Sequence, residues 1–238
     1  MSDARLLARA NPTVNIIGLE LLKFQPKDIV QALSDTRSVE CTSEKPESVH
    51  LVGFSIGAMA AIKIAATCPE QVSKITLISP AAPLQLGAFL PNMAGKPIFQ
   101  LAMKHPRLLD LVTRIQGQIA KLSPIFMTRI LFGACGPSER ALLSDPSFRH
   151  AINDAFQLSF NQYRQTYLAY MEDYVADWSS TLADVRCPVD LWHGTADTWS
   201  PLEMSVALRD VLGDICTLHE IEDAEHYSTM SYTKLRSA

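Results

Sequence analysis

The stretch His50-Leu-Val-Gly-Phe-Ser-Ile-Gly57 decides the fold, because a short apolar run passes here directly into a helix-forming one. The apolar run at 48–53 predicts a buried strand, and residues 56–67, rich in Ala and Ile, predict a helix. Four further short apolar runs predict strands at 13–18, 74–79, 188–193 and 216–221. Buried strands that alternate with helices are typical of a parallel sheet. The sequence therefore predicts the α/β class.

A serine lies at the junction of the predicted strand and helix, in the pattern Gly53-x-Ser55-x-Gly57. A nucleophilic serine needs a sharp turn of this kind, and small residues two positions to either side let strand and helix approach closely. The hydroxyl then projects at the N-terminus of the helix, where the N–H of Ile56 can stabilise an oxyanion. The pattern also fits a glycine-rich turn in which Ser55 only caps the helix.

An activated serine needs a base, and the base needs an acid that fixes its tautomer. Asp197 follows the predicted strand at 188–193, and His226 follows the one at 216–221. The order serine, acid, histidine, each after a strand, is the order found with this turn. His193 ends a buried strand, which favours a structural role. The capping-box pattern Ser200-Pro-Leu-Glu203 predicts that a helix begins there.

Residues 84–182 break the alternation, since they contain no convincing strand and predict helices at 97–103, 107–122, 124–132 and 150–178. We therefore expect a core formed by residues 1–83 and 183–238, with a helical cap inserted at 84–182. Six cations and one acid lie between Lys96 and Arg129. This excess suits an anionic substrate or an acidic partner, or it reflects only solvated helix faces.

Four segments resemble the α/β-hydrolase superfamily, in particular its esterase-like and lipase-like members with a helical lid: VHLVGFSIG (49–57), KITLISPAAP (74–83), CPVDLWHGTADTWSP (187–201) and EDAEHYS (222–228). The resemblance implies that Ser55 is the nucleophile, Asp197 the acid and His226 the general base. It implies a small-molecule ester or related acyl substrate, an acyl-enzyme, and no metal or organic cofactor. Acyl transfer, C–C bond hydrolysis and perhydrolysis stay open on the same residues, since one fold hosts many chemistries.

The N-terminal part departs from the family pattern, because only 54 residues precede Ser55. The family's first strands do not fit in that length, and no His-Gly loop precedes Ser55 to supply a second oxyanion N–H. Gly18 is the one candidate for that loop. A sheet shortened in this way leaves an unpaired edge and favours self-association. The alternative function is therefore a catalytically impaired or non-catalytic member of the fold that acts as a binding module, or an incomplete gene product.

Length and composition set outer limits on the function. The 238 residues suit one large domain or one domain with an insertion. The 21 Lys and Arg against 25 Asp and Glu exclude the basic surface that nucleic-acid binding needs. Five scattered cysteines without a C-x-x-C pair argue against a disulfide framework or a zinc site. We expect a cytoplasmic location, because no secretory signal and no apolar run long enough to span a membrane is found.

Overall fold

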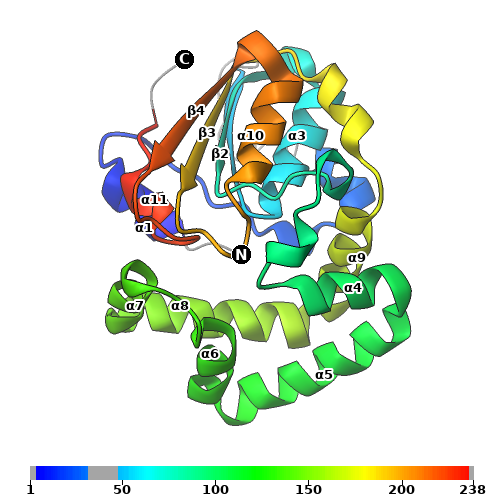
Figure 1. The fold of residues 1–238 in the computed structure, drawn as a ribbon, viewed down its shortest axis with the longest axis vertical. Helices are drawn as coiled ribbons and strands as arrows, with labels where there is room; N and C mark the ends of the chain where they lie inside the picture. Colours follow the sequence, from blue (N-terminus) through cyan, green and yellow to red (C-terminus); the bar gives the residue numbers. More distant parts are fainter. Residues whose placement is uncertain (1–3, 32–47, 236–238) are drawn as a thin grey trace.

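A four-stranded sheet forms the centre of the computed structural model, which describes residues 4–31 and 48–235 (Figure 1). The strands lie side by side in chain order, and all three pairings are parallel. They are β1 (Val49–Phe54), β2 (Val72–Ile78), β3 (Val189–Gly194) and β4 (Cys216–Ile221). Each coincides with a predicted strand to within about two residues, so the predicted α/β class is confirmed.

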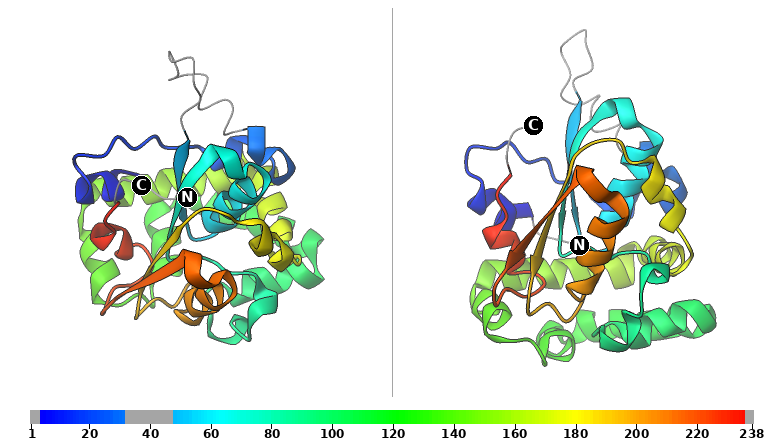
Figure 2. Two further views of the ribbon diagram at one scale, coloured as in Figure 1. Left: turned by 90° about the horizontal axis from the view of Figure 1, so that it is seen from above. Right: turned by 45° about the horizontal axis from the view of Figure 1, so that its top comes forward.

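Helices cover both faces of the sheet, which explains why the central strands are nearly continuous apolar runs. α3 (Gly57–Thr67) and α10 (Glu203–Leu212) pack on one face, whereas α1 (Ala4–Ala10) and α11 (Thr229–Tyr232) lie together on the other (Figures 1 and 2). Ile75 and Leu77 of β2 and Leu191 of β3 are completely buried between these layers. Burial of each such side chain stabilises the fold by about 1.5–3 kcal/mol.

The predicted strand at 13–18 is wrong, because the chain is irregular there and most of its residues are exposed. Val14 and Ile17 expose 38% and 49% of their surface. A β-branched run forms a strand only where it packs against neighbours, and these side chains have no sheet to pack on. Within residues 4–31 and 48–235, β1 pairs only with β2, so β1 is an edge strand.

Six α-helices lie between β2 and β3, in a stretch that the structure describes without a gap. They are α4 (Lys96–Lys104), α5 (Pro106–Leu122), α6 (Pro124–Phe132), α7 (Pro137–Ser144), α8 (Pro146–Gln157) and α9 (Arg164–Val175). A proline in the first turn of the first five of these helices fixes where each begins, since proline lacks the N–H that this turn leaves unbonded. The single helix predicted at 150–178 is instead α8 and α9, joined by a π-helical turn at Leu158–Gln162, and α7 was not predicted.

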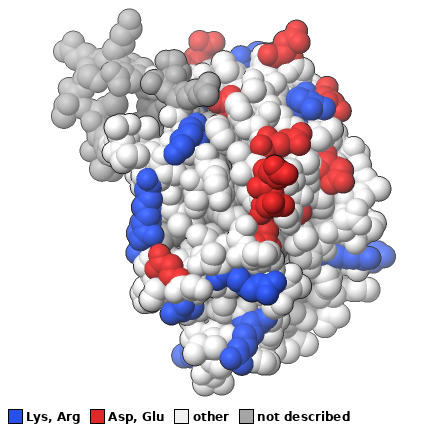
Figure 3. Space-filling view, turned by 60° about the vertical axis from the view of Figure 1, so that its left-hand side comes forward, with Lys and Arg blue, Asp and Glu red and all other residues white. Residues whose placement is uncertain are grey.

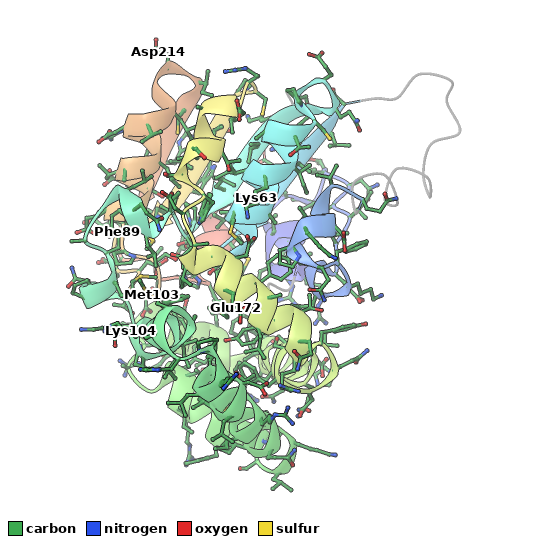
Figure 4. All side chains as sticks on the ribbon, turned by 90° about the vertical axis from the view of Figure 1, so that its right-hand side faces the viewer. Lys63, Phe89, Met103, Lys104, Glu172 and Asp214 are labelled. Atoms are coloured by element: carbon green, nitrogen blue, oxygen red, sulfur yellow. The ribbon has the colours of Figure 1, made fainter. Side chains whose placement is uncertain are left out.

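These helices extend beyond the carboxyl ends of the strands (Figure 1). An ion pair of 2.6 Å between Lys63 on α3 and Asp173 on α9 ties them to the core. Figure 4 shows Lys63 and the neighbouring Glu172 on the same side of the molecule. On the face drawn in Figure 3, acidic side chains gather over the strand-bearing part and cations predominate below it. No helix in the described part of the chain is long and apolar enough to cross a membrane.

Candidate active site

Ser55 occupies a strained turn between β1 and α3. Its φ is +54°, in the left-handed region that costs a residue with a side chain roughly 1–2 kcal/mol. The turn is held by hydrogen bonds from Ser55 N–H to Ile78 O (3.1 Å) and from Ala81 N–H to Ser55 O (3.1 Å). Ile56 follows as the N-cap of α3, so its N–H lies at the positive end of that helix.

The two glycines of the turn differ in what they do. A Cβ on Gly53 would lie 2.8 Å from Ala58 Cα and 2.8 Å from Gly57 O, so only glycine lets β1 and α3 approach this closely. A Cβ on Gly57 would meet nothing within 4 Å. The steric requirement expected at both positions therefore holds at Gly53 and is wrong at Gly57.

Asp197 lies in the loop after β3 and is almost completely buried. Its Oδ1 accepts hydrogen bonds from the N–H groups of Trp199 (2.8 Å) and Ser200 (3.0 Å), and its Oδ2 accepts one from His226 Nδ1 (2.8 Å). Burial alone raises the pKa of Asp197, but the charge on His226, the nearby His193 and the hydrogen bond from His226 outweigh burial and hold that pKa well below its usual range. Asp197 is therefore a carboxylate that keeps the proton of His226 on Nδ1.

His226 follows β4 and is packed against the serine turn. Its ring centroid lies 4.8 Å from that of Phe54, the residue directly before Ser55. Its carbonyl oxygen accepts a hydrogen bond from Ser79 Oγ (2.9 Å), at the end of β2. With Nδ1 bonded to Asp197, the neutral imidazole presents Nε2 as an acceptor. The loops after β1, β3 and β4 therefore meet at one end of the sheet.

The structure joins the predicted acid and base directly, but it does not join the serine to the base by a hydrogen bond. Among the described residues, the Ser55 hydroxyl makes no side-chain hydrogen bond, although catalytic hydrogen bonds are often long before substrate binds. Gly18 lies in the exposed N-terminal stretch, where a Cβ would meet only Ala4, at 3.9 Å. Gly18 thus lies beside α1, and a Cβ there would meet no atom of the turn at Ser55.

His193 has a structural environment, as its place at the end of β3 suggested. It is completely buried; its Nε2 donates to Ser200 O (2.7 Å), and its Nδ1 accepts from Ser205 Oγ (2.6 Å). Its Nε2 also lies 3.5 Å from Asp197 Oδ2. His193 therefore helps to hold the loop that contains Asp197 in place, through its bond to Ser200 O.

The capping box expected at Ser200 is wrong. α10 begins at Glu203 with Leu202 as its N-cap, and no side chain caps it. The N–H of Ser200 is bound by Asp197 Oδ1, and its carbonyl is bound by His193. The N–H and C=O of Ser200 are thus bonded within the loop that contains Asp197, and they are not available to begin a helix.

Two buried carboxylates next to His226 were not predicted. Glu225 directly precedes His226 and accepts hydrogen bonds from Gly136 N–H and Glu139 N–H (2.8 Å) at the start of α7. Glu139 in turn accepts from Tyr227 N–H and Ser228 N–H (3.4 Å). Burial raises the pKa of Glu139 to about 7, although the charge on His226 and the bond from Tyr227 N–H oppose this rise.

A small cavity of about 30 Å³ lies beside the base, lined in part by His226, Trp199, Glu139 and Cys135. A larger groove of about 620 Å³ runs between the 25–30 segment, α3 and α9, and none of the predicted site residues lines it. Residues of the helical segment and of the candidate site therefore line the 30 Å³ cavity together. The larger groove is separate from the candidate site.

Within residues 4–31 and 48–235, no group of three or more His, Cys, Asp or Glu side chains could hold a metal ion. Cys68, Cys135, Cys187 and Cys216 are not in disulfides, and Cys41 lies outside the described residues.

Comparison with known proteins gives matches over most of the chain. A family model described as "Alpha/beta hydrolase family" matches residues 18–234. A curated protein of Aromatoleum aromaticum, pimeloyl-[acyl-carrier protein] methyl ester esterase, is 27% identical over 192 residues, which cover 79% of this chain and 71% of that protein.

Solved structures share the fold at low identity. A thermophilic esterase from Thermogutta terrifontis matches with a TM-score of 0.58 at 16% identity, over 92% of this chain and 70% of that chain. A candidate lipase from Acinetobacter baumannii AYE matches with a TM-score of 0.56 at 16% identity, over 91% of this chain. The chain spans 65% of the length of that second protein. At this identity the similarity shows the fold alone.

Proposed function

Because the chain belongs to the alpha/beta hydrolase family, we propose that it is a serine hydrolase that cleaves a carboxylic ester or a related acyl compound. The observation that carries the proposal is the hydrogen bond of 2.8 Å between His226 Nδ1 and Asp197 Oδ2, on a histidine packed against the residue that precedes Ser55. A buried acid that fixes a histidine tautomer beside a strained serine is the arrangement that nucleophilic acyl transfer needs. An ester is also the substrate class in the name of the 27%-identical relative.

The proposed reaction uses Ser55 as nucleophile and His226 as the group that moves the proton. Ser55 Oγ attacks the carbonyl carbon while its proton passes to His226 Nε2, and the N–H of Ile56 donates to the oxyanion. The tetrahedral intermediate then expels the alcohol, which takes the proton from His226. Water attacks the acyl-enzyme in the same manner, releases the acid and restores Ser55. Asp197 stabilises the imidazolium in both steps.

The segment at 84–182 serves in this proposal as a lid over the site. Its support is a set of contacts with the loops that hold the acid and the base. Ala94 N–H donates to Thr198 O (2.8 Å), and the ring of Phe132 lies 6.2 Å from that of Trp199 and 5.5 Å from that of Tyr227. Such a lid excludes water from the reaction and shapes the acyl pocket.

A specific observation favours the alternative, a non-catalytic member of the fold that serves as a binding module. The Ser55 hydroxyl has no hydrogen-bond partner among the residues that the structure describes, and no second oxyanion donor is assigned. Loss of one such donor costs about 10²–10³ in rate. The two proposals therefore predict different effects on ester hydrolysis when Ser55 is replaced.

The test is hydrolysis of p-nitrophenyl butyrate by the full chain and two serine variants. Ser55→Ala is expected to lower kcat by about 10³ or more, since the nucleophile is lost. The control Ser144→Ala changes an exposed serine on α7 and is expected to leave kcat within about twofold. Turnover by Ser55→Ala equal to that of wild type would contradict the serine mechanism and favour the binding module.

Two further expectations belong to the proposal. Self-association is expected through the edge of β1 that no other described strand pairs with. Sedimentation velocity at two protein concentrations tests it, and a single monomeric species at both would argue against it. A cytoplasmic location fits the unpaired thiols of the four described cysteines.

A further inference from the structure

A pair of carboxylates joins α7 to the loop that holds His226. Glu225 bonds the N–H groups of Gly136 and Glu139, and Glu139 bonds the N–H groups of Tyr227 and Ser228. Each carboxylate thus binds the backbone of the segment that holds the other. A Cβ on Gly136 would lie 2.9 Å from Glu225 Oε1, so a glycine at this position makes the approach possible.

His226 is held from several sides by this arrangement. Ser79 Oγ binds its carbonyl, Asp197 binds its Nδ1, and Glu139 binds the two N–H groups that follow it in the chain. Residues 225–228 therefore cannot shift without breaking bonds to β2, to the acid loop and to α7. Of these three partners, Glu139 is the one that belongs to the helical segment.

One oxygen of Glu139 is not needed for this support. The residue is 1% exposed, and its Oε2 has no hydrogen-bond partner in the part of the chain that the structure describes. Glu139 also lines the 30 Å³ cavity together with His226, a volume large enough for about one water molecule. A purely structural contact between α7 and the loop at 225–228 would need only the bonded oxygen of Glu139. A buried carboxylate oxygen without a hydrogen bond lowers the stability of the fold by about 1–3 kcal/mol or more.

When Glu139 is ionised, its charge lies on the wall of the cavity that His226 also lines. The charge on His226 lowers the pKa of Glu139, so the two groups interact electrostatically. An ionised Glu139 therefore attracts the imidazolium that forms when His226 takes the proton of Ser55. The other groups around His226 are Asp197 from the loop after β3, Glu225 and Tyr227 from its own loop, and Cys135 from the start of the α7 segment.

We propose that Glu139 is a positioning residue for His226: from α7 it fixes the backbone that follows the base and places a second carboxyl group, besides that of Asp197, in the cavity that the base lines. The proposal rests on the proposed role of His226 as general base. It assigns to the helical segment a part in the proton transfer, in addition to covering the site.

Glu139→Gln separates charge from support, because the amide oxygen keeps the bond to Tyr227 N–H while the charge is lost. The pH profile of kcat/KM is expected to inflect near pH 7 in wild type, where Glu139 ionises, and to lack this inflection in Glu139→Gln. NMR titration of the glutamate carboxyls in the full chain, with Glu139 assigned by the Glu139→Gln spectrum, measures the contact without substrate. The Glu139 midpoint is expected to rise from about 7 in His226→Gln, because the charge on His226 lowers the pKa of Glu139.

Two more variants complete the test. Glu139→Ala removes the backbone support as well, and it is expected to lower kcat about tenfold with KM changed less than twofold. Asp173→Asn is the control, since it removes a carboxylate of the helical segment that is bonded to Lys63, away from His226. This control is expected to leave both the midpoint of the Glu139 titration and the pH profile unchanged.

The outcomes separate this proposal from the proposed function. An unchanged Glu139 titration midpoint in His226→Gln overturns the positioning role whether or not the chain is active. A raised midpoint in a chain that hydrolyses no ester supports the contact and counts against the esterase proposal. If Glu139→Ala does not fold, Glu139→Gln decides the question.

Discussion

Glu139→Gln is predicted to stabilise the protein at neutral and alkaline pH, although the same change removes a charge beside the proposed base. The pKa of Glu139 is raised from 4.5 to about 7, with burial as the largest cause. Between these values the unfolded chain loses its proton while the folded chain keeps it. The contribution of Glu139 to the free energy of unfolding is therefore fully present below pH 4.5 and is lost as the pH rises through about 7.

The magnitude follows from the pKa of Glu139, which is about 2.5 higher in the folded chain than in the unfolded chain. At about 1.36 kcal/mol per pH unit, the ionised carboxylate destabilises the fold by about 3 kcal/mol above pH 7. A glutamine carries no charge at any pH, so Glu139→Gln does not lose this stability. The variant should gain about 3 kcal/mol over wild type between pH 4.5 and pH 8.

Urea unfolding of both proteins at pH 4.5, 6, 7 and 8 measures this gain. Every other titrating group is present in both proteins, so its contribution cancels when one free energy of unfolding is subtracted from the other. Asp173→Asn is the control and should show no comparable rise over this range. A difference that stays flat between pH 4.5 and pH 8 would refute the argument, because the buried carboxyl would then not be protonated in the fold.

The remaining predictions concern the acid and the serine turn. Asp197→Asn should keep the fold but lower kcat about 10³–10⁴-fold, because the amide cannot fix the same tautomer of His226; ester hydrolysis measures this, and a loss under tenfold would argue against Asp197 as the acid. Gly53→Ala should lower the free energy of unfolding by about 2 kcal/mol or more, whereas Gly57→Ala should change it by less than about 1 kcal/mol. Chemical denaturation of the two variants checks this, and equal losses at the two positions would contradict the packing described for the turn.

The placement of the site on the sheet is predictable because local patterns determine it. β1 and β3 are largely apolar runs that give way to glycine or polar residues, and β4 is a mixed run that is followed by acidic residues. The loops that contain Ser55, Asp197 and His226 can therefore be placed after strand ends. β3 and β4 are parallel neighbours, and their carboxyl-end loops therefore lie side by side. The hydrogen bond between Asp197 and His226 is consistent with that topology.

Other features depend on contacts that no local pattern indicates. Glu139 binds residues 86–89 positions away, and in the sequence it shows only as an acidic residue in the first turn of a short helix. The run at 13–18 has the composition of a strand but lacks a neighbour to pair with. Ser200 has the pattern of a helix cap, yet Asp197 takes its N–H. In each case a partner distant in sequence, or its absence, outweighs the local preference.

Labelling with a fluorophosphonate probe, read by peptide mass spectrometry, tests the central claim most directly, since the probe bonds only to a serine activated by a base. The account predicts an adduct on Ser55 of the full chain, lost in His226→Ala and after heat unfolding, and kept in the control Ser144→Ala. A folded chain that takes no adduct on Ser55, or an adduct that persists equally in His226→Ala, would contradict the claim that Asp197 and His226 activate this serine.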